Sequence, residues 1–162
     1  MGSSGHHGSA RELRASVTVD APAQDVWSVI SDVRNIAAAS PELVAMVPVL
    51  RGGLRVGQNY IGINRRKLVV WPTRSRIRTV VPGRELSWDT LTSGARWVYE
   101  LSDSDGGTGL TLRRPVPGRL TGLSDIFARF LLGGAEGHAD ELEQGMLRTL
   151  EVLRQKVEGR SR

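Results

Sequence analysis

The chain has 162 residues, a formal net charge of +5 at pH 7 and no cysteine. The lack of cysteine excludes a disulfide framework, thiol catalysis and a thiolate metal site. No apolar run reaches the roughly 18 residues that a bilayer-crossing helix needs, so we expect a cytoplasmic protein without a membrane span.

Residues 1–10, MGSSGHHGSA, have the glycine, serine and histidine composition of an expression tag. We expect this stretch to be disordered and a single domain to occupy residues 11–160, which is an ordinary length for one domain. His138 is then the only native histidine.

The first predicted elements are one strand and two short helices. Residues 13–19 alternate and are rich in β-branched side chains, which predicts a strand. Residues 20–23, Asp-Ala-Pro-Ala, supply an N-cap and an early proline, and apolar side chains follow at helical spacing. A second helix is predicted over residues 32–39, ending before the Ser-Pro-Glu step at residues 40–42.

The middle of the chain reads as an antiparallel meander, because short alternating runs are separated by turn residues. The acidic, glycine-rich stretch at residues 103–108 is predicted to be a loop. The runs cover residues 44–50, 59–66, 68–81, 85–91 and 95–114.

A helical region follows residue 118, and its last part, residues 139–157, is predicted to be one long helix. Apolar side chains recur there on a single face, at Leu142, Met146, Leu150 and Leu153.

The period of two along the strands places four large aromatic side chains on one face of the sheet: Trp71, Trp88, Trp97 and Tyr99. Arg114 shares this face, since it follows the inward positions of the last strand by steps of two. Rings with polar tips suit a ligand pocket, and they equally suit a packed core in which their N–H and O–H groups find partners.

Several motifs, taken in this order, resemble the START/Bet v 1-like (SRPBCC) superfamily, and more closely the polyketide cyclase/dehydrase-type proteins that are abundant in actinobacteria. The resemblance covers about residues 13–159. The motifs are VTVDAPAQDVWSVISDVRNI (17–36), SPE (40–42), GINRR (62–66), WPT (71–73), PGRELSW (82–88), WVYELSDSDGGTGLTLRR (97–114) and TLEVLRQKVEG (149–159).

The resemblance implies an α+β helix-grip fold, in which a curved antiparallel sheet of about six or seven strands wraps around a long C-terminal helix. It also favours a protein that binds a hydrophobic or aromatic small molecule, such as a polyketide-like or lipid metabolite, in an internal cavity. We expect the wall to consist of Trp71, Trp88, Trp97, Tyr99 and Phe127, and the orienting polar groups to be Asn64, Arg114 and His138.

A polyketide cyclase or aromatase is the alternative, with His138 as general base and Arg114 stabilising an enolate. Each of these residues also has a plainer interpretation. His138 can be a solvent-exposed or hydrogen-bonded residue, Arg114 can extend to the rim of the sheet, and Asn64 can be a hydrogen-bonding residue at a strand end. The sequence alone leaves open whether a reaction is catalysed.

We expect no cofactor and no metal. One native histidine and no cysteine cannot supply the ligands of a zinc or iron site, and the glycine pairs lack the spacing of a phosphate-binding loop. We expect a monomer or a homodimer.

A third alternative is a nucleic acid or another acidic partner on the outward arginines, because neighbouring strands carry a stripe of them. A solvated strand face explains the same pattern, since no exposed aromatic side chains are interleaved for base stacking. The stripe consists of Arg65, Arg66, Arg74, Arg76, Arg78, Arg96 and Arg113.

Overall fold

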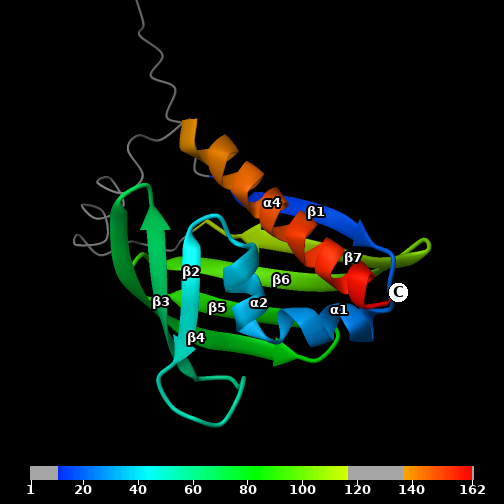
Figure 1. Ribbon diagram of the computed structural model, residues 1–162, viewed down its shortest axis with the longest axis horizontal. Coiled ribbons are helices and arrows are strands. Elements are labelled where there is room, and N and C mark those ends of the chain that lie inside the picture. The colour runs from blue at the N-terminus through cyan, green and yellow to red at the C-terminus, as the bar shows by residue number, and fades with distance from the viewer. Residues whose placement is uncertain (1–10, 117–136, 162) are drawn as a thin grey trace, which may run out of the picture.

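The computed structural model describes residues 11–116 and 137–161, which form one antiparallel sheet and three helices (Figure 1). The elements run in the order β1 (Leu13–Val19), α1 (Ala23–Ile30), α2 (Val33–Ala39), β2 (Leu43–Pro48), β3 (Asn59–Arg66), β4 (Val69–Val81), β5 (Glu85–Thr90), β6 (Ala95–Ser104), β7 (Gly107–Arg114) and α4 (Gly137–Arg160).

The seven strands form a single sheet in the order β1-β7-β6-β5-β4-β3-β2, so only β1 and β7 are paired across a long stretch of sequence. Figure 1 shows α4 lying along β1, with α1 and α2 on the same side of the sheet. The α+β helix-grip fold and the number of strands are therefore as the sequence predicts.

The long helix α4 packs mainly on the edge strand β1, and it also contacts α1, α2 and β7. Its buried side chains recur at helical spacing and include Met146, Leu150, Leu153 and Val157. These residues pack into one core with the sheet and the two short helices. Burial of this apolar stripe is what holds α4 on the sheet.

The starts of the two short helices differ. Asp32 caps α2, because its side chain accepts a hydrogen bond from the backbone N–H of Arg34 at 3.1 Å. The prediction of an N-cap side chain for α1 was wrong, since Pro22 occupies the N-cap position and no side chain caps the helix. Instead, the backbone carbonyl of Pro22 accepts hydrogen bonds from the backbone N–H groups of Asp25 and Val26.

The predicted loop at residues 103–108 contains the turn, but it is too long. The strands β6 and β7 continue until Ser104 faces Gly107, which leaves a two-residue turn of Asp105 and Gly106. Gly106 adopts a positive φ of 80°. An Asp-Gly pair suits such a turn because its twist matches that of the flanking strands.

Candidate functional site

The inner face of the sheet, meaning the face on which the helices lie, carries the predicted aromatic side chains. Pairing of β5 with β6 sets Trp88 opposite Trp97, and sets Leu86 opposite Tyr99 in the next inward row. The four aromatic residues that the alternation placed on this face lie in described strands. They divide into two groups with different surroundings.

Trp88 and Tyr99 form the closed group. Their rings stack with centroids 5.6 Å apart and an interplanar angle of 23°, and the residues are only 5% and 2% exposed. Both belong to the hydrophobic core that includes Leu150 and Leu153 of α4. Burial raises the pKa of the Tyr99 hydroxyl, which therefore stays neutral.

Trp71 and Trp97 form the open group, because each is only partly buried. The guanidinium of Arg114 lies over the ring of Trp97, with its carbon 5.2 Å from the ring centroid. This distance is within the range of a cation–π interaction. The end of β7 positions Arg114, since this residue pairs with the buried Leu13 of β1.

Arg114 has unusual electrostatic surroundings. It is partly buried, yet it forms no hydrogen bond and no ion pair with any described residue. Burial lowers the pKa of Arg114, and the negative charge of Glu42 opposes that shift in part. Because an arginine side chain stays protonated in proteins, the inner face holds a cation without a close counter-ion among residues 11–116 and 137–161.

Polar side chains continue the inner face across β3, β4 and β5. Asn64 donates a hydrogen bond from Nδ2 to Oγ1 of Thr73 at 3.0 Å, and the hydroxyls of Ser75 and Thr90 are 3.3 Å apart. Thr73, Ser75 and Thr90 were not among the site residues predicted from the sequence. Thr90 could have been found by extending the inward positions of β5 by one step.

Gly62 keeps part of this polar region free of side-chain atoms. A Cβ at this position would lie 2.6 Å from Oγ1 of Thr73 and 3.2 Å from Cδ1 of Leu43. The absence of a side chain there allows the threonine hydroxyl to stay within reach of Asn64.

Two of the predicted site residues lie where the structure gives no contacts. Phe127 is outside the described residues. His138 is in the first turn of α4, but only its backbone is described. The roles assigned to both residues stay predictions.

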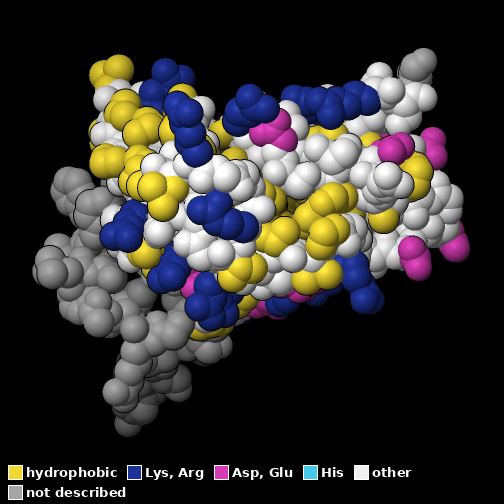
Figure 2. Space-filling view, turned by 90° about the horizontal axis from the view of Figure 1, so that it is seen from below, with side chains coloured by type: hydrophobic (Ala, Val, Ile, Leu, Met, Phe, Trp, Pro, Cys, Tyr) yellow, Lys and Arg dark blue, Asp and Glu magenta, His cyan; other side chains and the backbone are white. Residues whose placement is uncertain are grey.

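Half of the outward arginine stripe is paired with acidic side chains. The contacts are Arg78 and Arg96 with Asp89, and Arg113 with Glu12 and Glu100. The outward assignment of Arg66 was wrong: it follows Asn64 by two residues in β3 and pairs with Glu42 and with Glu141 of α4, on the inner face. Figure 2 shows Lys and Arg side chains scattered over one side of the molecule with hydrophobic side chains between them, not a continuous basic surface. This pairing favours a solvated strand face over a nucleic-acid surface.

Two grooves lie on the outer face of the sheet, away from the aromatic side chains. The larger has a volume of about 450 Å³ and is lined in part by Arg84, Glu100 and Thr111. The smaller, of about 290 Å³, is lined in part by Arg96 and Ser87. Six of the eight residues that line each groove are polar or charged, so the grooves do not resemble the predicted apolar cavity.

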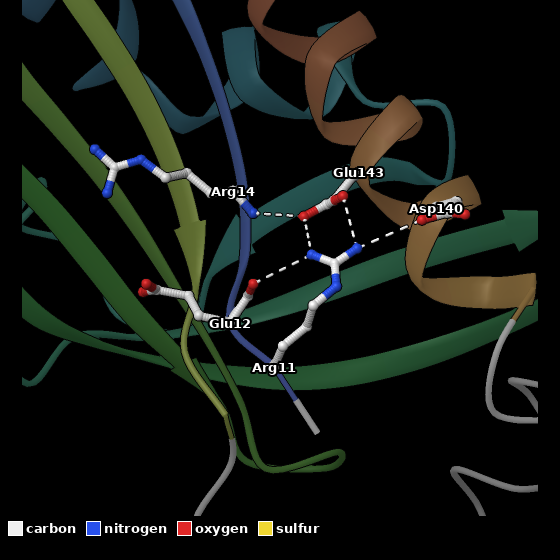
Figure 3. Close-up of polar contacts among 5 residues, drawn as sticks. All are labelled: Arg11, Glu12, Arg14, Asp140 and Glu143. Carbon is white, nitrogen blue, oxygen red and sulfur yellow. Dashed lines mark hydrogen bonds and ion pairs between the residues drawn. The ribbon is translucent and has the colours of Figure 1, made fainter. Parts of the chain in front are cut away.

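A cluster of charged groups fixes the start of α4 against β1 (Figure 3). Arg11 reaches both carboxylate oxygens of Glu143, at 2.6 and 3.0 Å, and lies 3.4 Å from Asp140. The backbone N–H of Arg14 also donates to Glu143, at 3.1 Å. We name these four residues the α4 clasp, and they set the position of the helix end nearest His138.

Within residues 11–116 and 137–161, no three histidine, cysteine, aspartate or glutamate side chains come together as a candidate metal site. The same part of the chain contains no helix that is both long enough and apolar enough to cross a membrane.

The comparisons with known proteins agree with the observed fold. The family model described as "Polyketide cyclase / dehydrase and lipid transport" matches residues 10–151. A comparison with curated protein sequences finds no match.

Solved structures share the fold at low sequence identity. The Zhui aromatase/cyclase from Streptomyces sp. R1128 superposes with a TM-score of 0.68 at 22% identity, over 94% of this chain and 96% of that one. The Polyketide_cyc-like protein Cgl2372 from Corynebacterium glutamicum gives a TM-score of 0.59 at 22% identity, over 91% of each chain. The di-domain aromatase/cyclase StfQ from the steffimycin biosynthetic pathway gives 0.67 at 15% identity, over 93% of this chain and 51% of that one.

Proposed function

Because the chain belongs to the polyketide cyclase / dehydrase and lipid transport family, we propose that it binds a hydrophobic or aromatic small molecule that carries an anionic oxygen. The molecule lies between the inner face of the sheet and α4. Trp71 and Trp97 contact its apolar surface, Arg114 contacts the anionic oxygen, and Asn64 donates to a carbonyl.

The observation that carries this proposal is the state of Arg114. A partly buried guanidinium normally has an acidic partner, because removing a charge from water is unfavourable unless it is paired. Arg114 has no such partner among the described residues, and it lies on an aromatic ring. A carboxylate or phenolate oxygen of a ligand would supply the missing partner.

Asn64 supports a ligand with a second polar group. Its amide donates to Thr73 with one N–H, and an asparagine amide has a second N–H and an acceptor oxygen. Since Asn64 and Trp71 face each other in the β3–β4 register, a ring on the indole would have a hydrogen-bonding group beside it. This arrangement suits an oxygenated aromatic molecule better than a plain hydrocarbon chain.

The test compares an acid with its neutral analogue. We expect a naphthoate to bind saturably and to quench tryptophan fluorescence, and its methyl ester to bind more weakly. In Arg114→Met the affinity for the acid should fall about tenfold or more, while the affinity for the ester should change little. Arg74→Met is the matched control, because Arg74 is an exposed arginine on the outer face.

Equal affinities for acid and ester in the parent protein would refute the role of Arg114. Native mass spectrometry of the purified protein adds an independent measurement, since a tightly held ligand would travel with the chain. A co-purified neutral hydrocarbon would count against the anionic oxygen.

A second candidate is a cyclase or aromatase, and the family description together with two structural neighbours that are aromatase/cyclases supports it. In this mechanism His138 removes a proton from a methylene group between two carbonyls, and Arg114 stabilises the resulting enolate oxygen. Most of the rate enhancement would come from holding a flexible chain in a folded conformation.

His138→Ala separates the two candidates. Unchanged binding of a poly-β-ketone analogue with loss of cyclised product would support the enzyme. Absence of product with both the parent protein and the variant would support a binding protein.

A further inference from the structure

The hairpin between β3 and β4 ends in an exposed apolar side chain. Arg66 pairs with Val69, so the turn consists only of Lys67 and Leu68. Leu68 is 99% exposed, and Lys67 has a positive φ of 55°, which is uncommon for a residue other than glycine. The fold therefore holds a leucine in full contact with solvent at the end of a tight turn.

Leu68 is not an isolated surface residue. Val69 and Val70 follow it directly and are 56% and 59% exposed. Scattered apolar side chains on a protein surface need no explanation, but three consecutive ones at a projecting tip form a local apolar surface. We name residues 65–70, Arg-Arg-Lys-Leu-Val-Val, the hairpin tip.

The basic half of the hairpin tip is only partly neutralised. Arg66 pairs with Glu42 and Glu141, at 3.7 and 3.3 Å. Arg65 and Lys67 form no ion pair within the part of the chain that the structure describes. The tip therefore combines exposed apolar side chains with two neighbouring cations, Arg65 and Lys67, that have no acidic partner among the described residues.

We propose that the hairpin tip docks on an anionic lipid bilayer. Leu68 enters the boundary between headgroups and acyl chains, and Arg65 and Lys67 contact lipid phosphates. Apolar side chains flanked by basic ones are the pattern that binds such a surface, since burial of apolar area and attraction to anionic lipids act together.

The shape of the tip favours a fluid layer over a protein groove. Val69 and Val70 are successive residues of β4, so their side chains point to opposite faces of the sheet, and both are exposed. A protein groove would cover one of these faces. A bilayer interface surrounds an inserted tip and covers both.

Docking at this tip would turn one end of the protein toward the membrane. Figure 1 shows the β3–β4 hairpin on the same side of the molecule as the start of α4, and the ion pair of Arg66 with Glu141 joins the two directly. Asn64 and Trp71 lie on the same hairpin, on the inner face. This inference uses residues other than those of the proposed ligand site and stands independently of it.

The experiment exploits the absence of cysteine from the chain. Leu68→Cys labelled with an environment-sensitive fluorophore gives a single-site probe, and Val81→Cys at the far end of β4 is its control. We expect a blue shift for the label at position 68 on vesicles of phosphatidylcholine with about a third phosphatidylglycerol. We expect no shift for the label at position 81, or on vesicles of phosphatidylcholine alone.

Unlabelled variants give the partition coefficient by vesicle co-sedimentation. Leu68→Asp should lower it about tenfold, while Val81→Asp should leave it unchanged. Arg65→Glu should lower it several-fold, and Arg84→Glu, in the turn at the other end of β4, should not. Since Leu68 is fully exposed, the Asp variant should keep the unfolding midpoint of the parent protein.

Three results would overturn the proposal. The first is equal sedimentation of Leu68→Asp and Val81→Asp, and the second is binding that does not depend on the anionic lipid. The third is a blue shift that grows with protein concentration without vesicles, since that would assign the tip to contact with another protein copy.

Discussion

Replacing Arg114 by methionine is predicted to stabilise the ligand-free protein while weakening ligand binding. Replacing a buried ion pair by apolar side chains of similar volume is often neutral or raises the free energy of unfolding by about 1–4 kcal/mol, and an unpaired charge has no ion-pair attraction to lose. Arg114 is only partly buried, so the lower end of that range applies. Loss of the cation–π contact with Trp97 costs about 0.5–1 kcal/mol, which leaves a net gain of at most about 0.5 kcal/mol.

Urea denaturation followed by circular dichroism measures this gain. A stabilisation of about 0.5 kcal/mol moves the urea midpoint upward by about 0.2–0.5 M, since m is about 1–3 kcal/mol/M for small proteins. The slope m should not change, because the variant keeps the fold and the surface exposed on unfolding.

Arg113 provides the control, because it is the preceding residue of β7 and points to the opposite face. It contacts Glu12 at 2.6 Å and Glu100 at 3.0 Å. Arg113→Met should therefore lower the free energy of unfolding, by about 1 kcal/mol for two partly exposed pairs. A loss of stability in Arg114→Met as large as in Arg113→Met would show that Arg114 is already paired, and the reasoning would fail.

Three further predictions concern stability. Glu143→Gln should destabilise the protein at pH 7: Arg11 lowers the pKa of Glu143, so the carboxylate stabilises the fold above its unfolded pKa of about 4.3. That contribution is lost as the pH falls through the lowered folded value, so unfolding curves of variant and parent should converge in acid. Leu150→Ala should lower the free energy of unfolding by about 2–5 kcal/mol, measured in urea, because Leu150 is fully buried between α4 and the sheet. Gly107→Ala should lower the midpoint of thermal unfolding more than Gly159→Ala, because the new Cβ would meet the backbone oxygen of Val19 at 2.0 Å, whereas at Gly159 it would meet nothing within 4 Å.

The strands and their inward faces could be predicted from the sequence because alternation is a local property. It placed Trp71, Trp97 and Arg114 on one face, and the register agrees. The alternation is interrupted in β4 at a point that the sequence does not mark. The register of β4 shifts between Ile77 and Thr79, so Val80 and not Thr79 continues the inner face.

The contacts that fix α4 could not be predicted, because they join distant parts of the chain. Arg11 and Glu143 are 132 residues apart, and nothing in the spacing of either selects the other. The same holds for Lys156 of α4, which donates to the side chain of the buried Asn35. These pairs depend on the position of α4 on β1, which burial of its apolar stripe sets.

The aromatic side chains of the inner face divide into a buried pair and a partly exposed pair, and variants in the two groups should behave differently. Trp88 and Tyr99 are part of the core, so variants at these positions should change stability and ligand affinity together. Trp97 and Arg114 are partly exposed, so Arg114→Met should change ligand affinity and stability in opposite directions. Leu68→Asp should change neither, because the hairpin tip contributes to vesicle binding alone. If Leu68→Asp also removed naphthoate binding in the absence of vesicles, the tip and the ligand site would be one site, and the two proposals would have to be replaced by a single one.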